Sequence, residues 1–272
     1  MNRAHLKWMT GMLALLMLSV FSWPAQGAED AARALARAVL DRPDGRDAVM
    51  SLSMTLTEDG RSPRVRSMVS YRLDDPGQGV RTLIRFTAPA DIAGTGLLTH
   101  DPLVGDSNQW IYLPAMKRVR RVDANRKGGR FVNSDYYFED LRTRQVELDR
   151  HRLLGREEVE GVMCEVLEST PVDSTNSVYD RRVAWIDPST LLPLRVEFHE
   201  GGGRTPAKRM QVVRREQVQG YWTVMESVMR DLNRGHETRL VTERIVYDQG
   251  LPESLFGTRA LEDERSERPY RP

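Results

Sequence analysis

The chain has 272 residues, of which 40% are hydrophobic and 29% are charged. This composition is typical of a globular protein and excludes a collagen-like chain, a disordered chain and a membrane protein with several spans. Lys and Arg (40) nearly balance Asp and Glu (39), so the net charge of +1 provides no overall field for nucleic acid. Cys164 is the only cysteine, which excludes an intrachain disulfide and any zinc or iron–sulfur site built from several cysteines.

The first residues have the pattern of a secretory signal peptide. A basic start precedes an apolar run from Met9 to Phe21, and small residues follow up to Gly27. The run is shorter than the about 20 residues that a membrane-spanning helix needs. We therefore expect residues 1–27 to be a signal peptide cleaved after Gly27, and residues 28–272 to form a single domain that is exported to the periplasm. The alternative is an uncleaved membrane anchor.

A helix is predicted first, and the period of hydrophobicity then changes to two. In residues 29–40 apolar side chains recur at helical spacing, and a turn at residues 41–45 ends the helix. The apolar face of this helix comprises Ala31, Leu35, Ala38 and Val39. From Met50 to Leu56, Met and Leu alternate strictly with Ser and Thr, which is typical of a half-buried strand. A turn at residues 58–60 leads into Val65–Tyr71, so these two strands form a hairpin.

The same alternation predicts strands through the rest of the chain. They are Val80–Phe86, Trp110–Leu113, Val119–Val122, His151–Glu158, Val162–Thr170, Arg181–Ile186, Leu192–His199, Lys208–Gln217, Trp222–Asp231 and Glu237–Tyr247. A second short helix is predicted from Ser134 to Thr143, with Ser134 as its N-cap. The fold class is therefore mainly β (α+β): a curved antiparallel sheet or half-barrel of about ten to twelve strands, with an apolar concave face lidded by short helices.

The sequence contains no enzyme motif. The nucleophile elbow G-x-S-x-G, a phosphate-binding glycine loop and the zinc motif H-E-x-x-H are absent. The pairs His100–Asp101 and Glu139–Asp140 have the residue types of acid–base chemistry, but no nucleophile accompanies them, and adjacent strand residues face opposite ways. Cys164 lies in an alternating strand and fits a small core residue. We therefore expect no catalytic residues, no metal, no cofactor and no enzymatic activity.

The most distinctive stretch runs from Asp106 to Leu141. It contains W-x-Y-x-P from Trp110 to Pro114, then a basic strand, and then F-x-x-S-D, aromatic residues and E-D-L from Phe131 to Leu141. Together with the leading helix, the Met-rich hairpin and the later W-I-D-P of residues 185–188, this pattern resembles the bacterial family of LolA-like outer membrane lipoprotein-sorting proteins. The resemblance covers about residues 30 to 262. Asn133 departs from it, at a place where a small Gly is expected.

The resemblance implies a LolA/LolB/LppX-type fold whose apolar concave face accepts acyl chains. It also implies a periplasmic carrier of a lipid or lipoprotein, which serves an inner-membrane RND (MMPL-type) exporter or the sorting of outer-membrane lipoproteins and lipids. The alternative is a regulatory, stress-sensing periplasmic module on the same fold without a carrier role. A hydrolase is the third hypothesis.

The first group of candidate site residues would line an apolar cavity. Methionine adapts to a disordered acyl chain, and aromatic rings provide broad apolar walls. These candidates are Met50, Leu52, Met54, Leu56, Trp110 and Tyr112. The alternative is that they simply pack beneath the helices.

The second group is a basic stretch with a net charge of +6 between Lys117 and Arg130. Arginine binds phosphate and carboxylate bidentately, so this stretch is a candidate docking patch for an anionic membrane surface or for an acidic face of the exporter. It comprises Lys117, Arg118, Arg120, Arg121, Arg126, Lys127 and Arg130. The alternative is a solvated hairpin whose arginines pair with acids of neighbouring strands.

The third group is a structural motif in the second predicted helix. Ser134 is its N-cap, and Asp135 lies in the first turn, where a negative charge meets the helix dipole. Asp140 is expected to pair with an arginine of the preceding basic strand.

Overall fold

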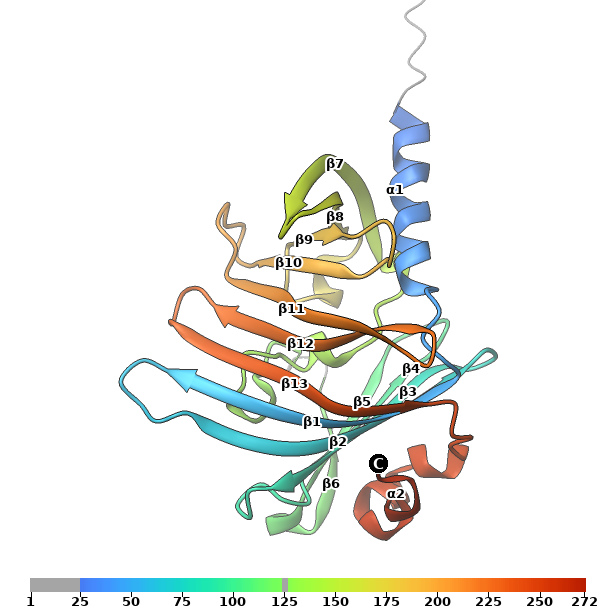
Figure 1. Ribbon diagram of the computed structural model, residues 1–272, viewed down its shortest axis with the longest axis vertical. Helices are drawn as coiled ribbons and strands as arrows, with labels where there is room; N and C mark the ends of the chain where they lie inside the picture. Colours follow the sequence, from blue (N-terminus) through green and yellow to red (C-terminus); the bar gives the residue numbers. More distant parts are fainter. Residues whose placement is uncertain (1–24, 124–126) are drawn as a thin grey trace, which may run out of the picture.

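The computed structural model describes residues 25–123 and 127–272, and in this part of the chain thirteen strands form one antiparallel sheet. The strands are β1 (Asp47–Glu58), β2 (Arg64–Asp75), β3 (Gly79–Ala88), β4 (Gly96–Asp101), β5 (Asn108–Leu113), β6 (Arg118–Arg121), β7 (Asp149–Val159), β8 (Val162–Pro171), β9 (Arg181–Ile186), β10 (Pro193–His199), β11 (Lys208–Val218), β12 (Tyr221–Asp231) and β13 (His236–Tyr247). Figure 1 shows that the sheet is strongly curved. The predicted fold class is therefore confirmed.

The order of the strands explains why the chain crosses the sheet. The order is β6-β5-β4-β3-β2-β1-β13-β12-β11-β10-β9-β8-β7, so β6 and β7 are consecutive in sequence but lie at opposite edges. The chain between them must therefore pass over one face of the sheet. We call residues 127–148 of this connection the crossover segment.

Two faces of the sheet are defined by the register of paired strands. Met50, Leu52, Met54 and Leu56 share one face, which we call the inner face, as their alternation predicted. The outer face carries a row of directly paired residues on five strands, which starts at Val49 on β1: Val49, Tyr71, Leu83, Leu98 and Trp110.

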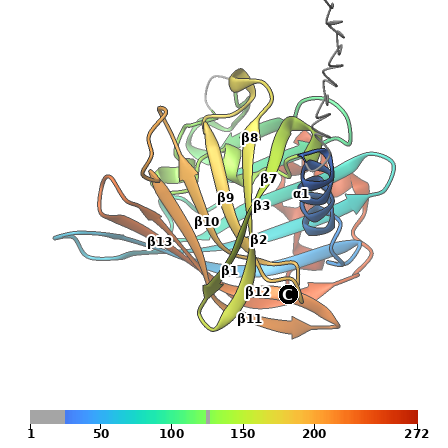
Figure 2. The same cartoon turned by 90° about the horizontal axis from the view of Figure 1, so that it is seen from above.

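Helix α1 (Ala25–Leu40) covers the inner face at the β7–β9 end, as Figures 1 and 2 show. Ala32 and Ala36 pack against Leu167 and Ile186. The helix is confirmed, but the buried stripe differs from the prediction by one position: Ala32 is fully buried and the predicted Ala31 is exposed. The predicted cleavage after Gly27 falls within α1, and the rest of the predicted signal peptide, residues 1–24, lies outside the described residues.

The outer face is covered by the C-terminal residues 251–270, which include η7 (Glu253–Phe256) and α2 (Thr258–Glu262). Leu255, Phe256 and Leu261 pack onto the outer row. The buried guanidinium of Arg85 donates to Glu267 Oε1 from both Nε (3.0 Å) and Nη2 (2.6 Å). Gly96 makes room for this pair, because a Cβ there would lie 2.7 Å from Leu261 and 2.8 Å from Arg85.

Two expected elements differ from the structure. Strand β4 was not predicted, because most of its residues are buried and it lacks alternation between apolar and polar residues. The predicted helix from Ser134 to Thr143 is wrong: the crossover segment contains short 3-10 turns, η3 (Phe131–Asn133), η4 (Glu139–Leu141) and η5 (Val146–Leu148). No helix in the described part of the chain has the length and apolar character needed to cross a membrane.

Candidate ligand-binding site on the inner face

The crossover segment is attached to the sheet through Asp140. Its Oδ2 accepts a hydrogen bond from Lys208 Nζ at 2.7 Å, and its Oδ1 accepts one from the Tyr179 hydroxyl at 2.6 Å. Lys208 lies on β11, is 1% exposed, and places its ammonium 3.5 Å from the centre of the Tyr137 ring. Burial and the nearby Asp140 carboxylate raise the pKa of Tyr179 well above its usual value, so this hydroxyl remains a donor. The buried ion pair therefore fixes the segment over β9–β11.

Asp135 provides a second attachment, to β13. Its fully buried carboxylate accepts a hydrogen bond from Thr238 Oγ1 at 2.6 Å, and its backbone N–H donates to the same oxygen at 2.9 Å. His236 Nδ1 lies 2.6 Å from the carboxylate. Arg130 pairs with Asp135 and also with Asp231, at 3.1 Å. The two aspartates thus attach the segment to two different parts of the sheet.

Aromatic residues of the crossover segment fill the inner face above β1–β3. Phe131 is 1% exposed and packs against Met54 and Leu56. Its ring centre lies 5.6 Å from that of Phe86. Asn133 has a φ of 61°, a left-handed conformation that glycine and asparagine adopt more easily than other residues, which accounts for the departure from the family pattern at this position. This half of the inner face is closed.

The other half of the inner face, around Met50, contains a cavity. Its volume is about 180 Å³, and apolar side chains form much of its wall: Met50, Leu192, Trp222, Val224 and Ile245. Met50 is half-buried, and Trp222 is 39% exposed. We call this the Met50 cavity. Its lining suits an apolar ligand.

A second cavity, of about 340 Å³, lies next to the Met50 cavity. Arg42, Asp44 and Arg72 line both cavities and form a charged partition between them. Arg72 Nη2 donates to Asp44 Oδ1 at 2.7 Å, and Arg42 Nη2 lies 3.8 Å from Asp44 Oδ2. Burial raises the pKa of Asp44, and the two arginines oppose this shift. The volumes lie at or below the lower end of the about 300–1,000 Å³ typical of ligand pockets. A long-chain ligand would therefore need both cavities and would displace the Arg72–Asp44 pair.

The structure does not bring the six predicted cavity residues together. Met50 lines the cavity, but Leu52, Met54 and Leu56 pack beneath the crossover segment on the same face. Trp110 and Tyr112 lie on the outer face, where they pack against the C-terminal residues. A single cavity lined by all six is therefore wrong. No local motif in the sequence indicates the other lining residues Asp44, Arg72, Leu192, Val224 and Ile245.

The predicted basic patch divides into separate parts. Lys117, Arg118, Arg120 and Arg121 are exposed on the edge strand β6 or next to it, and none of the four has an ion-pair partner among the described residues. Arg130 instead belongs to the buried Asp135 network, and Lys127 Nζ donates to Thr175 O at 2.8 Å. Arg126 lies outside the described residues. The exposed patch is therefore shorter than the sequence predicted.

The structural motif makes other contacts than those predicted. Ser134 caps no helix: its hydroxyl donates to Phe131 O at 2.7 Å. Asp135 does not face a helix dipole, since its partners are those described above. Asp140 pairs with Lys208 on β11 and not with an arginine of the basic strand. The corrections for Asp135 and Asp140 share one cause, because their partners Thr238 and Lys208 lie far away in the sequence.

The fold defines a class of protein in which one curved open sheet is covered on both faces and keeps cavities on its inner face. A crystal structure described as "putative outer membrane lipoprotein-sorting protein domain" from Vibrio parahaemolyticus is 31% identical, with a TM-score of 0.81, and covers 86% of this chain and 99% of its own. A DUF1329 family protein from Desulfovibrio piger is 30% identical, with the same TM-score and coverage.

The chain belongs to the family of these two proteins, the DUF1329 family of outer membrane lipoprotein-sorting protein domains, as the sequence resemblance predicted. A family model described as "uncharacterized protein" matches residues 78–263. A LolA superfamily protein from Nitrosomonas europaea, at 18% identity and a TM-score of 0.63, shares the fold; it covers 86% of this chain and 97% of its own. No curated protein matches the sequence.

Proposed function

We propose that this protein is a periplasmic carrier that binds the acyl chains of a lipid or lipoprotein in the Met50 cavity. The proposal rests on the Met50 cavity of the inner face, which is lined by the apolar side chains of Met50, Leu192 and Ile245. The fold adds support, because a relative at 31% identity is described as a lipoprotein-sorting domain. Methionine suits such a site, since its flexible side chain adapts to a mobile chain.

The test uses a substitution that fills the cavity. Met50→Trp adds volume to the wall of the Met50 cavity and should abolish the lipid that co-purifies with the exported protein, as measured by native mass spectrometry. Met163→Trp is the matched control, because Met163 is 52% exposed on β8 and lines none of the cavities described above. A folded Met50→Trp variant that retains the same lipid as wild type would contradict the proposal.

Met54 is unsuitable for this test. It is 2% exposed beneath Phe131, so Met54→Asp would bury an unpaired carboxylate and unfold the inner face before any ligand was lost.

The same mass spectra test the rival proposal of a regulatory module. That module would retain a protein partner in fixed stoichiometry and no lipid.

The proposed location depends on export. We propose that residues 1–27 are removed after Gly27 and that the mature protein begins at Ala28. N-terminal sequencing of the protein from the periplasm measures this directly. Retention of the apolar run from Met9 to Phe21 would contradict it.

The exposed basic residues of β6 support a proposed docking surface, which we call the β6 patch: Lys117, Arg118, Arg120 and Arg121. We propose that it meets the anionic membrane surface or an acidic face of an inner-membrane RND (MMPL-type) exporter, the partner that the sequence resemblance implies.

Replacing Arg118, Arg120 and Arg121 by Gln should remove salt-sensitive flotation with anionic liposomes. Replacing Arg61, Arg152 and Arg265, which are also exposed, controls for the lost charge. Flotation that neither salt nor the triple variant changes would leave the exporter as the remaining partner, tested by co-purification.

A further inference from the structure

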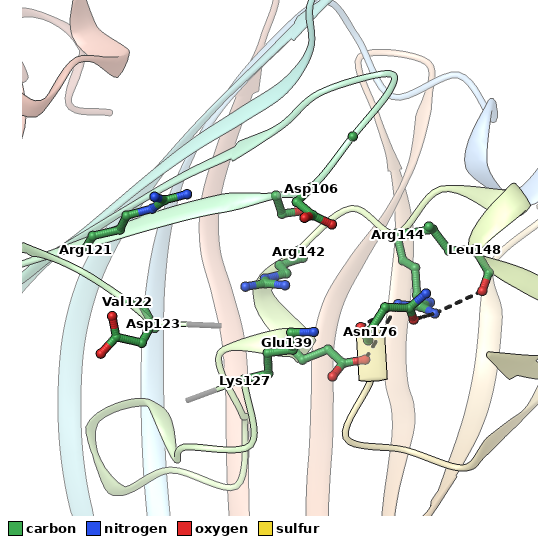
Figure 3. Close-up of a pocket in the computed structure, with 12 residues that line it drawn as sticks. Asp106, Arg121, Val122, Asp123, Lys127, Glu139, Arg142, Arg144, Leu148 and Asn176 are labelled. Carbon is green, nitrogen blue, oxygen red and sulfur yellow. Dashed lines mark hydrogen bonds and ion pairs between the residues drawn. The ribbon is translucent and has the colours of Figure 1, made fainter. Parts of the chain in front are cut away.

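A third cavity, of about 250 Å³, is strongly charged, in contrast to the Met50 cavity. It lies between the β4–β5 loop, the end of β6, the crossover segment and η6 (Ser174–Asn176). Figure 3 shows its lining, with the Arg142 guanidinium in the middle of the charged side chains. Four basic and three acidic residues contribute to it: Arg121, Lys127, Arg142, Arg144, Asp106, Asp123 and Glu139. Their contacts decide which charges remain available to a ligand.

Arg142 is held in place by a buried amide. Its Nε donates to Gln109 Oε1 at 3.1 Å. Gln109 is 1% exposed, and its Nε2 donates to Phe138 O at 2.9 Å and to Thr99 Oγ1 at 3.3 Å. Because a carbonyl oxygen can only accept, the contact with Phe138 fixes the amide so that its oxygen faces Arg142. The guanidinium is therefore oriented by a side chain that has no freedom to turn.

The two Nη atoms of Arg142 are left for another partner. Within residues 25–123 and 127–272 they have no hydrogen-bond or ion-pair acceptor. Burial lowers the pKa of Arg142, and the nearby carboxylates of Asp101 and Glu139 oppose this shift. A partly desolvated guanidinium with four unpaired N–H groups on its two Nη atoms gains strongly from an anion placed in its plane.

The other charges nearby are mostly engaged. Arg144 donates to Asp149 from Nε and Nη2, both at 2.9 Å. Glu139 accepts from the backbone N–H of Val178 at 2.8 Å and from the Ser177 hydroxyl. Among the residues that the structure describes, Lys127 Nζ has one hydrogen bond, to Thr175 O, and an ammonium has three protons to donate. Lys127 can therefore contribute to a ligand as well.

Two of the three acids that line the cavity remain. Asp106 and Asp123 are exposed, where water screens their charge. Arg121, which is also exposed, pairs with the neutral Asn108 and so keeps its charge. The fixed, partly desolvated charge of the cavity is therefore the Arg142 guanidinium.

We propose that this cavity binds an oxyanion of the phosphate class, held bidentately by the Nη atoms of Arg142, with Lys127 as a second cation. The planar guanidinium matches the spacing of two phosphate oxygens, which an ammonium cannot do. The site is separate from the Met50 cavity and goes beyond the proposed acyl-chain binding. The anion is either free phosphate or the phosphate of a lipid headgroup.

Isothermal titration of the whole exported protein with inorganic phosphate tests this site. Arg142→Gln should weaken phosphate binding about tenfold or more, because a hydrogen bond to a charged group contributes about 1.5–3 kcal/mol. Arg118→Gln is the matched control: it removes the same charge from the exposed β6 patch and should change the affinity by less than about twofold. Equal effects of the two variants, or no phosphate binding by wild type, would overturn the proposal.

Asp106→Asn gives a test of opposite sign that does not depend on the folding of an Arg142 variant. Removing this rim carboxylate should strengthen phosphate binding about twofold to fivefold, since it relieves a repulsion of the size seen for surface charges. Weaker phosphate binding by Asp106→Asn would show that the carboxylates of the cavity, and not Arg142, attract its ligand. That outcome also overturns the proposal.

Soluble lipids distinguish the two sources of phosphate. Short-chain phosphatidylglycerol that competes with inorganic phosphate, while the matched neutral diacylglycerol does not, assigns the site to a headgroup. Phosphate that binds without competition from phosphatidylglycerol assigns it to the free anion. Met50→Trp should leave phosphate affinity unchanged in either case, so failure of the carrier proposal and failure of this one are distinguishable.

Discussion

The two faces of the sheet are covered by segments of similar length that are held in different ways. On the outer face, the C-terminal residues bury Leu255, Phe256 and Leu261 in one apolar cluster around a single buried pair, Arg85–Glu267. On the inner face, the crossover segment is attached at separate points by Asp135 and Asp140, and cavities lie beside it. The outer covering is held by one apolar cluster around an ion pair, whereas the inner one is held by hydrogen bonds and ion pairs at separate points.

The difference follows from what each interaction requires. Apolar burial is non-directional and gains from every additional contact, so it favours one contiguous cluster of side chains. A buried carboxylate needs only its own donors, so it can hold a segment at one point while leaving space nearby. The inner face therefore has room for a ligand without disruption of its attachments.

The largest expected effect concerns the buried pair of the outer face. Arg85→Met leaves the Glu267 carboxylate buried with Arg271, at 3.7 Å, as its remaining cationic neighbour. Removing one partner of a buried pair costs about 3–5 kcal/mol, so the free energy of unfolding in urea should fall by that amount. The double variant Arg85→Met/Glu267→Met removes both charges and should recover most of the loss. A double variant no more stable than the single one would show that packing, and not the unpaired charge, causes the effect.

A smaller loss is expected for the attachment on the inner face. Lys208→Met leaves Asp140 without its cation, but Asp140 keeps the Tyr179 hydroxyl and the Tyr137 N–H, so the loss should be near the lower end of the same range, about 3 kcal/mol. Hydrogen exchange should accelerate in residues 131–141 and stay unchanged in residues 253–267. Equal acceleration in both segments would contradict the independence of the two coverings. Lys208→Met/Asp140→Asn serves as the charge-balanced control.

Much of the fold was predictable from local pattern. Strict alternation from Met50 to Leu56 identified β1 and its inner face, and the motif from Asp106 to Leu141 identified the family. Strand β4 was missed because Leu97 and Leu98 are both fully buried, one on each face, so the alternation disappears. The alternation of apolar and polar residues therefore does not reveal a strand whose two faces are both covered.

The site was less predictable, because it depends on contacts between distant parts of the chain. Trp110 and Tyr112 have the right chemistry for a cavity wall, but four intervening strand pairings decide which face they occupy. The predicted helix after Ser134 gives way to 3-10 turns, because Asp135 and Asp140 find their partners on β11 and β13, roughly 70 to 100 residues later. No local signal in the sequence indicates these partners.

The smallest expected effect is a pH dependence that originates at the partition between the inner cavities. Burial raises the pKa of Asp44 above its ordinary value of 3.8. Between the ordinary and the raised pKa, the folded protein therefore holds this proton more tightly than the unfolded chain does. The contribution of Asp44 to the free energy of unfolding is then fully present below pH 3.8 and is lost as the pH rises through the raised pKa. An asparagine at position 44 cannot titrate. The free energy of unfolding of Asp44→Asn should therefore fall less steeply with rising pH than that of wild type.

Urea unfolding of wild type and Asp44→Asn at a series of pH values measures this difference. In Asp44→Asn the fall of the unfolding free energy with rising pH should become shallower but should not vanish. The reason is that burial also raises the pKa of Glu267 on the outer face, and Glu267 therefore changes the unfolding free energy with pH in the same direction as Asp44 does. Asp74→Asn removes another carboxylate that contacts Arg72, at 3.2 Å, and controls for the loss of an ion pair at this arginine. Identical pH profiles for wild type and Asp44→Asn would mean that the partition is open to water. In that case the Met50 cavity and its neighbour already form one space, and a long-chain ligand would enter without displacing the Arg72–Asp44 pair.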